Sequence, residues 1–271
     1  MSSMSGQLSQ ILLPFAPGCR AARFVRREKR FTAIAIDPAT GEQLRAHTNN
    51  TGSMLGLLRA GAPALLSPAK NPDRALKWTL EALGLPNDLP NGAPNAAPDW
   101  VGVNTLTPNR LLAAAWRAGL LPEARAYARL TPEFKTGHSR LDARFDADVD
   151  ADAAADLPPL YVECKNVTLV EDDQAQFPDA ASERGRKHLD ELIRLRGEGC
   201  RAALFFLVQR PDGHCFAPAE VVDPAYAEGL ARALAAGVEA WVWRAAVAAD
   251  GIRLAERLPL ARPWATFAER A

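Results

Sequence analysis

The sequence predicts an α+β protein of two domains, a small β-barrel followed by an α/β domain with a mixed sheet. Residues 11–85 contain several short segments that alternate apolar and polar side chains and are separated by turn residues. Residues 86–99, "PNDLPNGAPNAAPD", are rich in Pro, Asn and Gly, which indicates a linker or an inserted loop. Later segments alternate between helical and strand patterns, as α/β domains do. We therefore expect a barrel domain over 1–85, a linker over 86–99 and an α/β domain over 100–271.

Four segments predict the strands of the barrel domain. "CRAARFVRREKRFTAIAID" at 19–37 alternates on both sides of a basic turn, so it predicts two strands. "PATGEQLRAH" at 38–47 contains a Gly turn, as the return of a hairpin does. "APALLSPA" at 62–69 predicts a short strand between prolines, and "ALKWTLEAL" at 75–83 fits a strand or a helix equally well.

The α/β domain is expected to begin with a helix at "TPNRLLAAAWRAGLL", where Thr107 can cap, Pro108 suits the first turn and Gly119 ends the pattern. "CRAALFFLVQR" at 200–210 is almost continuously apolar, which indicates a strand in a sheet covered on both faces. Further helices are expected at 179–199 and 223–237, and further strands at 139–148, 160–170 and 238–247.

Composition excludes some classes of protein but does not indicate a binding partner. Lys and Arg total 32, as do Asp and Glu, so the net charge of zero neither favours nor excludes a polyanion. The four cysteines, at 19, 164, 200 and 215, lack the spacing of a zinc site or a disulfide framework, so we expect reduced thiols. No apolar run reaches the ~18 residues of a membrane span. A cytoplasmic protein without a membrane partner is expected; its oligomeric state is open, and a dimer is compatible with the sequence.

An acidic pair and a lysine form the strongest candidate site. In "SRLDARF", residues Arg140, Asp142 and Arg144 alternate with apolar ones, and in "YVECK" Glu163 and Lys165 share one strand face. If these strands pair, Asp142 and Glu163 are neighbours, and their repulsion is relieved by a hard divalent cation such as Mg²⁺. Lys165 could then activate a water or stabilise charge on a phosphate. The alternative is an ordinary ion pair on a strand.

This D…E-x-K arrangement, within its order of helix, strands, helix and strand, resembles the metal site of the PD-(D/E)xK nuclease superfamily. Gln209, at the end of the strand that follows the second helix, is a candidate contact to the metal site or to phosphate; the alternative is a solvated strand end. Glu133 precedes the strand of Asp142, where related nucleases place a further acid. His188 is a candidate general base, although a lone His on a helix is more often structural.

Longer strings resemble one family. "NNTGSMLGL", "VGVNTLTPNRL", "KTGHSRLDARF", "YVECKNVTLV" and "AQFPDAASERGRKHLDEL" occur in the order typical of the sugar fermentation stimulation protein family. The resemblance runs from about residue 12 to residue 257 and implies DNA binding, an N-terminal OB-type barrel and a C-terminal restriction-endonuclease-like domain. Thr48 and Asn49 replace a usual Cys-Pro, and Arg27 and Glu28 replace the aromatic residue usual before the basic turn, but the acidic pair and the lysine are retained.

The function expected from this resemblance is DNA binding with a retained site for Mg²⁺ or Mn²⁺ and metal-dependent phosphodiester hydrolysis. The alternative is a non-catalytic DNA-binding regulator of sugar metabolism genes. Basic residues near the basic turn, near the Asp142 strand and at the start of the 179–199 helix are the expected DNA contacts: Arg26, Arg27, Lys29, Arg30, Lys135, Arg140, Arg184, Arg186 and Lys187.

Overall fold

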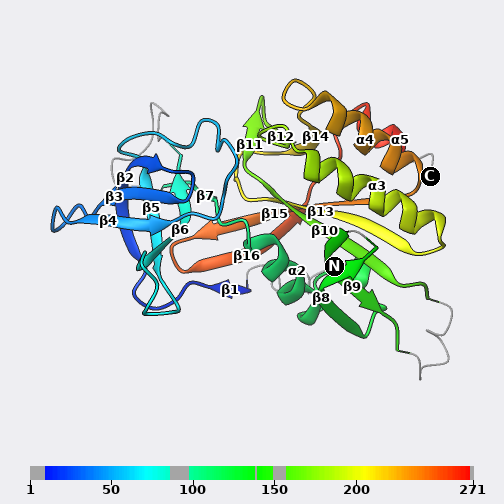
Figure 1. Ribbon diagram of the computed structural model, residues 1–271, viewed down its shortest axis with the longest axis horizontal. Helices are drawn as coiled ribbons and strands as arrows, with labels where there is room; N and C mark the ends of the chain where they lie inside the picture. Colours follow the sequence, from blue (N-terminus) through cyan, green and yellow to red (C-terminus); the bar gives the residue numbers. More distant parts are fainter. Residues whose placement is uncertain (1–9, 86–97, 138, 149–156, 269–271) are drawn as a thin grey trace.

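A computed structural model describes residues 10–85, 98–137, 139–148 and 157–268. It contains a barrel and an α/β domain that lie side by side and contact each other (Figure 1). The barrel strands are β2 (Arg20–Glu28), β3 (Thr32–Ile36), β4 (Gln43–His47), β5 (Pro63–Pro68), β6 (Trp78–Gly84) and β7 (Trp100–Gly102). Their order is β4-β3-β2-β5-β6-β7, and an added β4–β6 pairing closes five of them into the predicted OB-type barrel.

The barrel closes because alternate residues of its strands form one apolar interior. Phe24 of β2 is 1% exposed and packs with Leu44, Leu66 and Leu80 from three other strands. The ambiguous segment at 75–83 forms strand β6, since its apolar side chains fill this interior while its backbone pairs with β5 and β7. Tertiary pairing therefore decides between the two conformations that the local pattern allowed.

The α/β domain is built on a seven-stranded mixed sheet in the order β1-β16-β15-β13-β10-β9-β8. Strands β10, β13 and β15 are parallel, and the outer pairs are antiparallel. A small sheet of order β11-β12-β14 lies beside it. The bounds are β1 (Leu13–Pro14), β8 (Arg129–Thr136), β9 (Ser139–Asp146), β10 (Leu160–Val167), β11 (Leu169–Glu171), β12 (Gln174–Phe177), β13 (Arg201–Val208), β14 (Cys215–Pro218), β15 (Glu239–Ala248) and β16 (Gly251–Arg257).

Helices cover both faces of this sheet. One core contains α2 (Thr107–Arg117) and the short η1 (Pro122–Ala124), and the other contains α3 (Glu183–Gly197), α4 (Pro224–Ala235) and α5 (Trp264–Ala268). Strand β13 is buried along nearly its whole length, as its apolar sequence predicts. Thr107 is the first residue of α2 and not its cap, because Leu106 occupies the cap position without a side-chain hydrogen bond. Within the described ranges, no helix is both long and apolar enough to cross a membrane.

Two short strands cross the expected domain limits. Strand β7, within 100–271, pairs with β6 of the barrel, and β1, within 1–85, pairs with β16 of the α/β sheet. Composition locates the polar segment between the domains but does not show which sheet edge each flanking segment joins. Residues 86–97 of the expected linker lie outside the described residues.

Candidate metal site and interdomain groove

Glu163 and Lys165 lie in the interior of the α/β domain. Both are on β10, with Glu163 4% and Lys165 8% exposed, and Lys165 Nζ donates to Glu163 Oε1 over 2.8 Å. The same carboxylate oxygen pairs with Nδ1 of His188, which projects from α3 and is itself buried. The pair is therefore not a surface ion pair. Strand β10 is buried on both faces, because α2 covers one of them and α3 the other.

Asp142 lies where the pairing of β9 with β10 ends. The last pair is Ala143 with Val162, and beyond it Asp142 Oδ2 accepts a hydrogen bond from the backbone N–H of Cys164 over 2.8 Å. Its other oxygen, Oδ1, accepts from Asn109 Nδ2 on α2 over 2.6 Å. The carboxylate thus replaces a ladder hydrogen bond between the two strands, which fixes it beside β10.

The strand of Asp142 does not keep the expected alternation. Leu141 packs in the core on the side of α3, whereas Ala143 and Phe145 pack in the core on the side of α2. The change occurs at Asp142, opposite Glu133, whose φ of 49° is in the left-handed region. All three apolar residues are buried, but they pack on two faces of the sheet and not on one, because helices cover both faces.

The two carboxylates differ in electrostatic environment. Burial and the negative charge of Glu163 raise the pKa of Asp142, although the Cys164 N–H and the Asn109 amide oppose this. Burial would also raise the pKa of Glu163, but the charge of Lys165 and the hydrogen bond from His188 prevail and lower it to about 2. Glu163 is therefore ionised at neutral pH, and its charge makes ionisation of Asp142 less favourable.

The donor set fits a hard divalent cation. Glu163 Oε2 is buried and has no hydrogen-bond partner among the described residues, although a buried ionised oxygen without a partner is costly. Asp142 and Glu163 supply two carboxylates, as many as Mg²⁺ usually takes from a protein. The described residues contain no group of three or more His, Cys, Asp or Glu that could form an all-protein cage. The fit is therefore to an ion that keeps waters and substrate oxygens.

Gln209 and Glu133 lie at the edge of this centre. Gln209 is fully buried, its Nε2 donates to Asn166 Oδ1, and its backbone oxygen accepts from Gly102 N over 3.0 Å. Its alternative as a solvated strand end is wrong, because Gln209 is buried, contacts Asn166 of β10 within the α/β domain and joins this domain to β7 of the barrel through Gly102. Glu133 is exposed and pairs with Arg140 over 3.3 Å. It lines a cavity that also contains Asp142, so it faces the same space as the predicted acid.

A polar groove of about 250 Å³ lies between the barrel and the α/β domain. Its α/β side includes Lys165 and Asn166, and its barrel side is the loop of residues 49–52, within "NNTG". The sequence of this loop does not mark it as part of a site, because a turn with Asn and Gly has no distinctive chemistry. The fold brings it to the lysine of the candidate site.

The loop is fixed to both domains. Asn49 donates to Asn104 Oδ1 over 2.8 Å and accepts from Thr105 N over 3.1 Å. Arg27 of β2 donates to the carbonyl oxygen of Gly52 over 2.8 Å. Asp179 accepts from the backbone N–H of Met54 over 2.9 Å and, through its own carbonyl oxygen, from Ser53 Oγ over 2.6 Å. This network holds the barrel side of the groove in one position.

A second cavity, of about 560 Å³, adjoins the acidic pair on the side of α2. Asp142 and Glu133 line it together with Arg110 and Arg117, two exposed arginines of α2. These arginines were not among the predicted contacts, since nothing in the helix sequence shows that this face lies opposite Asp142. Their spacing of seven residues, two helical turns, is the one signal that could have placed them on one face.

The predicted DNA contacts fall into three groups. Arg26, Lys29 and Arg30 are exposed on the β2–β3 hairpin, where Lys29 and Arg30 have positive φ, while Arg27 contacts the loop. Lys135 and Arg140 are exposed on the β8–β9 hairpin.

The third group, on α3, is divided in its contacts. The guanidinium of Arg186 binds both oxygens of Asp223, the cap of α4, so it has a structural role. Lys187 pairs with Glu183 one turn away. Arg184 is exposed, and its Nε lies 3.5 Å from Nε2 of His188, whose Nδ1 faces Glu163.

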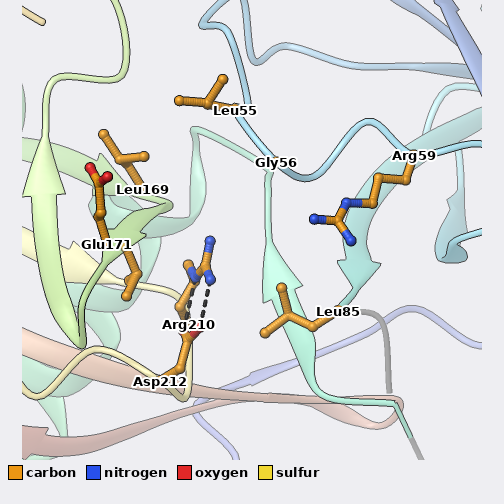
Figure 2. A pocket seen from close by; sticks show the side chains of 9 residues that line it. Leu55, Gly56, Arg59, Leu85, Leu169, Glu171, Arg210 and Asp212 are labelled. Carbon is orange, nitrogen blue, oxygen red and sulfur yellow. Dashed lines mark hydrogen bonds and ion pairs between the residues drawn. The ribbon is translucent and has the colours of Figure 1, made fainter. Parts of the chain in front are cut away.

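A third cavity, of about 430 Å³, also lies between the domains (Figure 2). Leu55, Leu85 and Leu169 form its apolar walls, and Arg59 and Arg210 point into it from the two domains. Arg210 is held in place, because it donates to both oxygens of Asp212 and to the Thr168 carbonyl oxygen. None of the candidate site residues lines this cavity.

Comparison with known proteins agrees with this architecture. Residues 25–89 match the model of the SfsA N-terminal OB domain, and residues 106–251 match that of the sugar fermentation stimulation protein RE domain. The chain belongs to the sugar fermentation stimulation protein family. A homolog from Maridesulfovibrio salexigens is 52% identical over 254 residues, covering 94% of this chain and 99% of the homolog, and one from Syntrophobacter fumaroxidans is 48% identical over 250 residues, covering 92% and 88%.

A solved member of the family has the same fold. The structure described as "Pyrococcus Furiosus SfsA in complex with Ca2+" superposes with a TM-score of 0.79 at 24% sequence identity, covering 93% of this chain and all of that one. The family and the two-domain architecture, an OB barrel followed by an α/β domain with a mixed sheet, are confirmed.

Proposed function

We propose that this member of the sugar fermentation stimulation protein family binds DNA and hydrolyses phosphodiester bonds with a divalent cation at Asp142 and Glu163. The observation that carries the proposal is the buried pair itself, in which one carboxylate oxygen, Glu163 Oε2, lacks a partner among the described residues. The Ca²⁺ named with the Pyrococcus relative adds support for a divalent cation. Mg²⁺ or Mn²⁺ is the expected ion, because carboxylate and water oxygens suit both.

In this proposal the three charged residues have distinct roles. A bound cation would polarise a phosphate oxygen and lower the pKa of a water. Lys165, whose Nζ reaches Glu163 Oε1 and which lines the interdomain groove, can donate a hydrogen bond to a phosphate oxygen or orient the attacking water. His188 donates from Nδ1 to Glu163 and keeps the carboxylate in one orientation. Its role is positioning, since it contacts Glu163 and not the groove.

A non-catalytic DNA-binding regulator is the second candidate. Glu163 Oε1 already accepts from Lys165 and His188, so the buried charges are neutralised to a large extent without a metal. In that case the fold retains the pair for stability, and DNA contacts come from the basic hairpin alone.

A metal-titrated cleavage assay decides between the two. Labelled single-stranded DNA, duplex DNA and RNA are incubated with the protein and increasing Mn²⁺ or Mg²⁺. We expect cleavage that requires metal and is lost in Asp142→Asn. The matched control is Asp146→Asn, four residues away on the same strand, where the carboxylate pairs with Arg144 and Arg129 and is not part of the site. Absence of cleavage on every substrate, or equal loss in both variants, would reject the enzymatic proposal.

A further inference from the structure

The two cavities that flank the acidic pair are adjacent. Thr105 lines the interdomain groove, and its neighbour Leu106 lines the cavity beside α2. Cys164 lines the groove, and its backbone N–H donates to Asp142, which lines the other cavity. The carboxylate pair therefore lies between a polar groove on one side and a cavity with two arginines on the other.

The groove is too confined for a double helix. It has a volume of about 250 Å³, and the barrel loop of residues 49–52 forms the wall that faces Lys165. Lys165 is only 8% exposed and Glu163 only 4%. A duplex is a stiff rod whose backbone cannot bend into a narrow groove without large deformation, whereas a single strand can enter it.

The side chains along the groove and the cavity beside α2 suit a single strand of nucleic acid. At the barrel end, Phe31 is 50% exposed and stacks with His47 at a centroid distance of 6.3 Å. Its carbonyl oxygen accepts a hydrogen bond from the backbone N–H of Thr48, next to the loop. Proteins that bind single strands use aromatic rings of this kind to stack bases. The adjacent basic hairpin contacts the loop through Arg27.

At the α/β end, Arg110 and Arg117 supply positive charge beside Asp142, and Leu106 is 58% exposed at the junction of the two cavities. An exposed leucine next to arginines is suited to contact with an unpaired base, while the guanidinium groups are suited to the backbone phosphates. Exposed hydrophobic side chains thus lie at the barrel end of a polar, partly basic path and at the junction of its two cavities.

We infer that one unpaired nucleic-acid strand runs from Phe31, past the loop of residues 49–52 and the acidic pair, to Arg110 and Arg117, and that the barrel loop excludes intact duplex. The inference rests on the proposed function, because it gives the substrate class of the same site. The barrel is then a wall of the site and not a separate DNA-binding module.

The test is a binding measurement without metal. Fluorescence anisotropy in EDTA compares a labelled dT 20-mer with a DNA dumbbell, a duplex closed at both ends by non-nucleotide linkers so that it has no unpaired nucleotide. We expect the dT strand to bind at least about tenfold more tightly, as stacking of a single base already gives a difference of this size. Equal binding, or tighter binding of the dumbbell, would overturn the inference. Tighter binding of an rU 20-mer than of dT would support the single-strand path and direct it to RNA.

Two variants locate the path. Arg110→Glu with Arg117→Glu should weaken dT binding at least about tenfold and reduce its salt dependence by about two phosphate contacts. Thr51→Trp, at an exposed position in the loop, should obstruct the groove and weaken dT binding by a similar factor. The control is Arg232→Glu, 68% exposed on α4, which should bind as the wild type does. Circular dichroism confirms that each variant is folded. Wild-type affinity in both site variants would refute the path.

These results are separable from the cleavage assay. A strong preference for single strands together with no cleavage in Mn²⁺ would retain the path and reject the nuclease chemistry. Cleavage of the closed dumbbell at a rate equal to that of the dT strand would retain the chemistry and reject the path.

Discussion

The contacts of Asp179 with Gly52 and Met54 of the barrel predict a loss of stability whose size follows from the structure. A Cβ added to Gly52 would lie 2.5 and 2.6 Å from the two carboxylate oxygens of Asp179, closer than real Cβ contacts. The backbone of Gly52 does not have positive φ, so alanine is excluded by this contact and not by conformation. The carboxylate cannot retreat without losing its 2.9 Å hydrogen bond from Met54 N–H.

We predict that Gly52→Ala lowers the free energy of unfolding by about 2 to 3 kcal/mol, the cost of leaving a hydrogen bond to a charged group unmade. Asp179→Ala should cost about 2 kcal/mol by removing the same bond. In the Asp179→Ala background, Gly52→Ala should cost less than about 0.5 kcal/mol, because the space is then open and alanine restricts the unfolded chain.

Urea unfolding of the four proteins of this double-mutant cycle, followed by tryptophan fluorescence at pH 7, measures the coupling. A coupling energy of about 2 kcal/mol is expected. If Gly52→Ala has the same cost in both backgrounds, the carboxylate does not require glycine at this position, and the argument that Asp179 fixes the loop fails. A loss of dT binding in Gly52→Ala should accompany the loss of stability.

Three further predictions concern other contacts. Gly102→Ala should lower the free energy of unfolding by about 1 to 3 kcal/mol, since its Cβ would lie 2.6 Å from Gln209 Cδ. In a Gln209→Ala background, where that side chain is removed, the same substitution should lower the melting temperature by much less. Asp223→Asn should cost about 2 kcal/mol at pH 7, because Asp223 caps α4 and binds Arg186. Burial raises the pKa of Asp223, but the N–H groups of Ser182 and Tyr226 and the Arg186 charge lower it below its usual value, so this stability is complete above about pH 4 and disappears at lower pH. Urea titrations at pH 7 and pH 3 should therefore show a smaller difference between the proteins at pH 3; a constant difference would reject the ionic role. His188→Asn should weaken Mn²⁺ binding about 10-fold to 100-fold in calorimetry while the fold is kept, because it releases Glu163; unchanged affinity would remove its positioning role.

The centre of the candidate site could be predicted from the sequence because it depends on one strand pairing. The adjacency of two strands is enough to bring Asp142 to β10, although the alternation of its own strand breaks at this residue, and the hydrogen bond from Cys164 N confirms the adjacency. Alternation alone could not show that both faces of β10 are covered, since that depends on where α2 and α3 pack.

Residues that reach the site from other elements could not be predicted locally. Asn109 and His188 contact the carboxylates from two helices, and the loop of residues 49–52 arrives from the other domain. Arg186 has a basic side chain that sequence alone assigns to DNA, but the fold places the cap of α4 beside it. In each case a partner distant in sequence determines the role.

Manganese binding tests the central claim most directly. Isothermal titration of the metal-free protein with MnCl₂ at pH 7 should show one site in the wild type and in Asp146→Asn, and no binding in Asp142→Asn. Binding that persists in Asp142→Asn, or its absence from the wild type, would contradict the assignment of Asp142 and Glu163 as a metal site.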